Sequence, residues 1–232
     1  MQGERSRWDL PDKRNFAVNY AREEGYSILL LLDDDVGGLT PAVVHAGCQM
    51  TEMTPIFGIL TGYFPDDSVV GHISSFCGGV GDRFVSGNCL FVRLDSCLGH
   101  FAGIYNEDWL FVLSSEVEAI GTFDSSVITQ RQHTKWRSTD EARWQEPGEF
   151  ITSAIVDLVI SDDTNLTFDR RFWEHAKAER RQLLARLKKG TGSAYSLTRV
   201  IEAADEALDS VNSDGILRFM DKFAHDSFAS RK

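Results

Sequence analysis

The stretch that most constrains the fold is ILLLLDDD, in which the apolar run Ile28–Leu32 leads directly into three aspartates. Five branched apolar residues without alternation predict a strand covered on both faces, as in a parallel sheet. Three adjacent carboxylates repel one another, so they need either water at a solvated turn or a bound cation. A turn in which the aspartates bond their own backbone before Gly37 and Gly38 is the alternative to a ligand site.

Apolar periodicity predicts that helices and strands alternate over residues 1–140. This alternation indicates an α/β fold with a mainly parallel sheet flanked by helices. After residue 140 the apolar residues recur at helical spacing, which predicts a helical C-terminal region over 141–232 that packs on the core. The predicted helices cover about 13–24, 41–50 and 107–118, and the predicted strands cover 28–32, 56–60, 89–93 and 126–130.

Composition excludes several classes of partner. The formal net charge of −11 argues against a nucleic acid polymer as ligand. No apolar run approaches the ~20 residues of a membrane-spanning helix, and the charged N-terminal segment does not resemble a secretory signal. The four cysteines lack CxxC spacing, which favours a reduced, cytoplasmic protein. An oligomer or a partner chain stays open.

The aspartates define the first candidate site. In a parallel sheet, ligands bind outside the carboxyl ends of the strands, where Asp33, Asp34 and Asp35 are expected. If the chain stays extended there, Asp33 and Asp35 point to one side and Asp34 to the other. Two carboxylates on one side suit Mg²⁺ or Mn²⁺, which commonly take substrate phosphates as further ligands.

A second candidate site is the segment YNEDWLF at 105–111. Asn106 is a plausible helix cap, and acids in a first helical turn are common because they interact favourably with the helix dipole. Placed in the same site as the aspartates, however, the carboxylate of Asp108 would suit a general base toward a hydroxyl nucleophile.

The ordered motifs KRNFAVNYA, ILLLLDDDV, FVSGNCLFVR and YNEDWLF resemble those of the GT-A-fold, family-2-like glycosyltransferases. The resemblance covers roughly residues 12–132. It implies a GT-A-like, Rossmann-type fold and a metal-dependent enzyme. The implied reaction moves a sugar from a nucleotide-diphosphate sugar to an acceptor hydroxyl, with inversion; neither the donor nor the acceptor is specified further.

The resemblance also implies a role for each matching residue. Asp108 would be the catalytic base and Glu107 would orient the acceptor. A Mn²⁺ or Mg²⁺ ion would be held by Asp35 and Asp33, with His133 as a further ligand. The residues implied to bind the donor are Asp33, Asp34, Arg14, Gly87 and Asn88.

The chain departs from the family at its start. Family members normally begin with a strand, a helix and a second strand that together hold the nucleotide base, whereas only about 14 residues precede the Arg-Asn helix here. This leaves three alternatives: a start placed too late, a reduced core that binds its donor differently, or a degenerate binding or assembly subunit. A haloacid-dehalogenase-like phosphatase also carries two aspartates in this spacing, but it needs a small hydroxyl residue where Gly37 stands.

Overall fold

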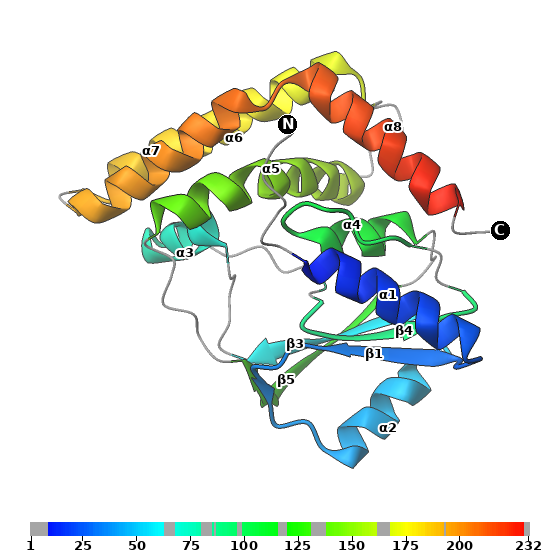
Figure 1. The fold of residues 1–232 in the computed structure, drawn as a ribbon. Coiled ribbons are helices and arrows are strands. Elements are labelled where there is room, and N and C mark those ends of the chain that lie inside the picture. Colours follow the sequence, from blue (N-terminus) through cyan, green and yellow to red (C-terminus); the bar gives the residue numbers. More distant parts are fainter. Residues whose placement is uncertain are drawn as a thin grey trace. The chain divides into compact units, whose positions relative to one another are not determined.

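A computed structural model describes residues 9–62, 68–79, 85, 87–96, 99–115, 120–130, 138–161, 168–192 and 194–229. The chain forms two compact units. Unit 1 comprises Met1–Tyr63, Val85–Arg131 and His225–Lys232, and unit 2 comprises Phe64–Phe84 and Gln132–Ala224. Figure 1 labels most of the helices and strands along the chain. The boundary predicted at residue 140, and the packing of the C-terminal region on the core, stay predictions.

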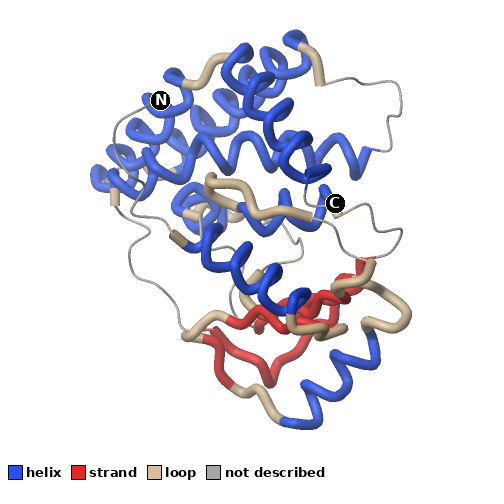
Figure 2. The backbone as a smooth tube through the Cα atoms, turned by 45° about the vertical axis from the view of Figure 1, so that its right-hand side comes forward, coloured by secondary structure: helices blue, strands red, loops and turns tan. Residues whose placement is uncertain are grey.

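Unit 1 is built on one five-stranded sheet in the order β1-β4-β3-β5-β2 (Figure 2, red). Three of its four strand pairs are antiparallel, and only β3 and β5 run parallel. The strands are β1 (Ile28–Leu32), β2 (Val36–Gly37), β3 (Ile56–Gly62), β4 (Cys89–Arg93) and β5 (Ile120–Gln130).

The predicted fold class, a mainly parallel α/β sheet of the GT-A type, is therefore wrong. Most of the described residues outside this small sheet are helical, and β4 runs antiparallel to both of its neighbours, β1 and β3. The physical reason is that an apolar run indicates that a strand is buried, but not whether it runs parallel or antiparallel to its neighbours. The direction depends on how segments that are distant in the sequence pair. The prediction that this strand is covered on both faces is also wrong at its end, because β1 is an end strand of the sheet and its Leu32 is 44% exposed.

The helices of unit 1 begin in different ways. In α2, the Thr40 hydroxyl accepts a hydrogen bond from the Val43 N–H, and Pro41 occupies the first turn. Asn106 is in the left-handed region (φ 59°), and its side chain makes no capping hydrogen bond. Asp108, one of the two acids of the first turn, accepts from the Trp109 N–H instead. These helices are α1 (Leu10–Glu23), α2 (Pro41–Met50) and α4 (Glu107–Ser114).

One apolar cluster of the core of unit 1 lies between the sheet and α2. Phe57 and Phe91 are buried there together with Ile59, Cys89 and Ile128. Gly47 permits the close approach of α2, because a Cβ at this position would lie 2.4 Å from Cζ of Phe91. The core thereby anchors β4, and with it the loop that precedes this strand.

Unit 2 consists of helices in its described residues. Trp173 is fully buried and packs edge-on against Phe150. On the surface, α6 and α7 are joined by ion pairs such as Lys188–Glu202 (2.9 Å). No described helix is long and apolar enough to span a membrane. The elements are α3 (Val69–Phe76), α5 (Thr139–Ser161), α6 (Arg170–Gly190), α7 (Tyr195–Ser210) and α8 (Ser213–Ala229), the last of which continues beyond unit 2.

Candidate functional site

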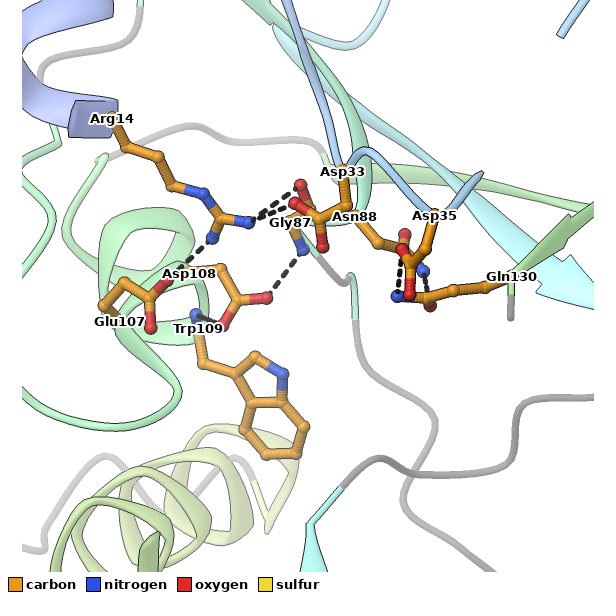
Figure 3. Close-up of polar contacts among 9 residues, drawn as sticks. All are labelled: Arg14, Asp33, Asp35, Gly87, Asn88, Glu107, Asp108, Trp109 and Gln130. Carbon is orange, nitrogen blue, oxygen red and sulfur yellow. Dashed lines mark hydrogen bonds and ion pairs between the residues drawn. The ribbon is translucent and has the colours of Figure 1, made fainter. Parts of the chain in front are cut away.

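Arg14 is the centre of a polar cluster in unit 1 (Figure 3). Its Nη1 donates a hydrogen bond to Glu107 Oε1 at 2.8 Å. Its Nη2 donates to Asp33 Oδ1 at 3.0 Å and to the Gly87 carbonyl at 3.3 Å. The guanidinium also lies over the ring of Phe101, 5.6 Å from its centroid. Arg14 thus connects three segments that are far apart in the sequence.

Local structure explains why these groups meet. Arg14 lies on the buried face of α1 with Val18 and Ala21, so its side chain points into unit 1. Asp33 directly follows β1, and its N–H donates to the carbonyl of Asn88 at 2.9 Å. Glu107 is the first residue of α4 and is only 3% exposed. A strand end, a helix start and a buried helix face therefore supply the cluster.

Gly87 holds Asp108 in place. Its backbone N–H donates to Asp108 Oδ2 at 2.6 Å, while the Trp109 N–H donates to Oδ1 at 2.9 Å. A Cβ at residue 87 would lie 2.5 Å from Arg14 Nη1 and 2.9 Å from Asp108 Cβ. Glycine is thus required by the close approach of these two side chains to the backbone.

A second chain of hydrogen bonds leads to Asp35. The Asn88 amide donates to Gln130 Oε1 at 2.8 Å, and Gln130 Nε2 donates to Asp35 Oδ1 at 3.1 Å. Figure 3 shows Asp33 pointing toward Arg14 and Asp35 pointing toward Gln130. The end of β5 and the start of β4 therefore fix the orientation of this carboxylate.

Negative charge exceeds positive charge in this cluster. Burial raises the pKa of Glu107 to about 8, and the carboxylate of Asp108 adds to the effect, although Arg14 opposes it. Burial also raises the pKa of Asp33, with Arg14 lowering it and Asp108 and Asp35 raising it. Burial alone would lower the pKa of Arg14, but the surrounding carboxylates outweigh it and raise that pKa.

The structure brings together most of the predicted site residues. The chain does not stay extended after Leu32: the Val36 N–H donates to the Asp33 carbonyl, and Asp34 and Asp35 form a turn. The two carboxylates expected on one side therefore have different partners, and Asp34 is exposed. His133 lies outside the described residues. The members in contact are Arg14, Asp33, Gly87, Glu107 and Asp108, with Asn88 and Asp35 linked through Gln130.

Two features of the site were missed from the sequence. Gln130, which links Asn88 to Asp35, ends a predicted strand, and a lone glutamine there carries no functional signal. Glu107 was expected to orient an acceptor, but its described contact is the buried ion pair with Arg14. Its place directly before Asp108 gave no indication of this, because the partner is 93 residues away.

Within the described ranges, no group of three or more His, Cys, Asp or Glu side chains is arranged to hold a metal ion. A cation at Asp33 and Asp35 would therefore need further ligands from a substrate. This is common for Mg²⁺ and Mn²⁺, which often combine one or two carboxylates with substrate phosphates.

Comparisons with known proteins identify no relative. No family model matches the chain, and no curated protein or solved structure matches it either. Together with the largely helical structure and the mostly antiparallel sheet, this makes the identification as a GT-A-fold, family-2-like glycosyltransferase wrong. Any function must be argued from the site itself.

Proposed function

We propose that the cluster around Arg14 binds the diphosphate of a nucleotide sugar through Mn²⁺ or Mg²⁺, and that the sugar passes to an acceptor hydroxyl. The observation that carries this proposal is the excess of acid: one guanidinium is surrounded by the carboxylates of Asp33, Glu107 and Asp108. Asp35 adds a further negative charge that acts on Asp33. A site with this balance favours a cation and disfavours an anion that arrives without one.

The donor set fits a hard divalent cation. The Oδ1 atoms of Asp33 and Asp35 each accept one hydrogen bond from a protein side chain. Carboxylate oxygens are ligands that suit Mg²⁺ and Mn²⁺. When bound, the cation would offset the charge that develops on the departing nucleotide diphosphate. Arg14 and Gln130 orient the two carboxylates, since each donates a hydrogen bond to one of them.

Asp108 is the proposed general base. Two backbone N–H groups hold its carboxylate in one orientation, and each of its oxygens retains a further lone pair. A fixed, half-buried carboxylate of this kind can accept the proton of an acceptor hydroxyl. Glu107 has a positioning role here, because its Oε1 accepts a buried hydrogen bond from Arg14 Nη1.

We further propose that the protein works in the cytoplasm.

A binding or assembly subunit without turnover is the second candidate. It is favoured by one observation: both carboxylate oxygens of Asp108 already accept hydrogen bonds from backbone N–H groups, which is typical of an acid with a structural role. In this alternative the cluster binds a metal–nucleotide complex and no sugar is transferred.

Calorimetric titration of the full chain with nucleoside diphosphates, with and without Mn²⁺, tests the proposal. We expect Mn²⁺ to strengthen diphosphate binding, and Asp35→Asn to weaken the Mn²⁺-dependent binding at least ~10-fold, the loss of about one strong ligand contact. Asp34→Asn is the matched control, because Asp34 is exposed and makes none of the cluster's contacts. Equal binding with and without metal would refute the proposal. Metal-dependent binding without product from a panel of nucleotide sugars would favour the binding subunit.

A further inference from the structure

The outer edge of β1 has no partner strand among the residues that the structure describes. β1 is the first strand in the order of the sheet, and among the described residues only β4 pairs with it. Figure 1 shows β1 at the border of the sheet, with β4 on its inner side. An open edge presents unpaired backbone donors and acceptors to another extended segment.

The hydrogen bonds at the two ends of β1 identify which residues face outward. At one end the Leu94 N–H donates to the Ser27 carbonyl, and at the other the Asp33 N–H donates to the Asn88 carbonyl. In an antiparallel pair, residues alternate between those bonded to the partner strand and those whose N–H and C=O point away. Leu29 and Leu31 thus bond to β4, and the backbone groups of Ile28, Leu30 and Leu32 face the open edge.

This edge lacks the features by which proteins usually prevent strand pairing. β1 contains no charged residue and no proline, and its register with β4 continues over five pairs without a bulge. Leu32 exposes 44% of its surface. The opposite end strand, β2, differs because it is only two residues long. The edge formed by β2 is therefore short, whereas the edge formed by β1 is longer, regular and apolar.

We propose that β1 pairs antiparallel with β1 of a second copy of this chain, about a two-fold axis at Leu30. In this register Leu30 lies opposite its own counterpart and Ile28 lies opposite Leu32, so the outward-facing residues of both copies are aligned for hydrogen bonding.

The charges select this arrangement. In the antiparallel register, the aspartates that follow Leu32 in the two copies lie at opposite ends of the paired strands, so no aspartate faces another. A parallel pairing in register would place the three aspartates of one copy beside those of the other, and like charges directly opposite are destabilising. Because the pairing consumes the open edge of both copies, association ends at the dimer. This inference does not depend on the proposed function.

Sedimentation equilibrium of the full chain over a range of concentrations tests the dimer. We expect a monomer–dimer equilibrium for the wild type and a monomer for Leu32→Lys, since an edge lysine disfavours strand pairing. Met53→Lys is the matched control, because Met53 is 78% exposed and lies outside the sheet. This control should dimerise like the wild type.

Leu32→Pro separates strand pairing from general apolar association. The N–H of Leu32 faces outward, so proline removes an edge donor without removing a hydrogen bond to β4. We expect this variant to be monomeric with an unchanged circular dichroism spectrum.

Amide hydrogen exchange then reads out the register. In the wild-type dimer the amides of Ile28, Leu30 and Leu32 should be protected, and in the Leu32→Lys monomer those of Ile28 and Leu30 should exchange rapidly. The amides of Leu29 and Leu31 should be protected in both proteins. The inference is overturned by a wild-type chain that stays monomeric up to about 0.1 mM, by a dimer that persists in both variants, or by a dimer in which the Leu30 amide exchanges freely.

Discussion

Each unit contains a buried arginine that is paired with two carboxylates, and the two clusters differ in their access to water. In unit 2, Arg180 Nε and Nη2 donate to the two oxygens of Glu146 at 2.8 Å, and Nη2 also donates to Glu149 Oε1 at 2.7 Å. The side chains of these three residues expose 9% or less of their surface. In unit 1, Arg14 is equally buried, but the side chain of its partner Asp33 is 31% exposed.

The difference shows how similar ion pairs can serve different purposes. The Arg180 cluster joins only α5 and α6, and the Glu149 Oε2 atom is buried without a hydrogen-bond partner among the described residues. It fixes helix packing and offers nothing to a ligand. The Arg14 cluster joins α1, the end of β1 and the start of α4, and it keeps Asp33 and Asp108 partly accessible. Accessibility of the acids therefore distinguishes the candidate site from the structural cluster.

The largest expected effect is that of Arg180→Met. Removing the guanidinium leaves Glu146 and Glu149 buried without their cation, which should lower the free energy of unfolding of unit 2 by about 3–5 kcal/mol. Hydrogen exchange of amides in α5 and α6 measures this loss separately from the amides of β3 and β4 in unit 1.

A matched control is Arg181→Met, on the same helix but in an exposed ion pair with Asp209. Its effect should be much smaller, because exposed pairs contribute little. Adding Glu146→Gln and Glu149→Gln to Arg180→Met should restore part of the stability. If Arg180→Met is no more destabilising than Arg181→Met, the cluster does not stabilise unit 2.

A smaller loss is expected for Arg14→Met. Glu107 loses its hydrogen-bond partner inside the protein, but Asp33 is accessible to water, and Glu107, whose pKa is raised to about 8, is mostly protonated at neutral pH. We therefore expect the free energy of unfolding of unit 1 to fall by about 1–3 kcal/mol, read from the exchange of β3 and β4 amides. Lys13→Met, which breaks an exposed pair with Asp9 on the same helix, should change little. A loss as large as that of Arg180→Met would show that the exposure of Asp33 does not matter.

The fold was predictable where local chemistry decides it. The strands at 28–32 and 89–93 and the helix that follows Thr40 occupy the expected residues, because apolar runs and caps act within a few residues. The direction of β4 was not predictable, since it depends on pairing with two strands that are distant in the sequence. The helix α3 lies between the predicted strands 56–60 and 89–93, where no helix was predicted, although Ser68 caps it by accepting from the Gly71 N–H.

The candidate site was predictable as a set of residues and not as a network. Acids after a strand and at the start of a helix identified Asp33 and Asp108, but nothing local indicates that Arg14 bridges Asp33 and Glu107. The side-chain directions of Asp33 and Asp35 were expected from an extended chain, and the turn at Asp34 and Asp35 removes that basis. Pairings across 19 to 95 residues are properties of the fold.

The smallest expected effect is a difference in how the two clusters respond to pH. Burial raises the pKa of Glu107 from 4.5 to about 8, and that of Glu146 from 4.5 to about 6. A carboxyl group whose pKa is raised by folding binds its proton more tightly in the folded state, so its contribution to stability is complete below pH ~4.5 and is lost as the pH rises through the folded pKa.

Between about pH 6.5 and pH 8.5, unit 1 should therefore lose on the order of 1 kcal/mol of stability through Glu107, whereas Glu146 should add almost no pH dependence to unit 2. The measurement is amide exchange in β4 and α5 over this pH range, corrected for the intrinsic pH dependence of exchange. Glu107→Gln should abolish the slope in unit 1, because glutamine does not titrate, while Glu146→Gln should leave the response of both units in this range unchanged. An equal slope in the wild type and in Glu107→Gln would show that Glu107 remains ionised beside Arg14 throughout. The excess of acid at Arg14 would then be held by that ion pair alone, and the contrast between the two clusters would reduce to the exposure of Asp33.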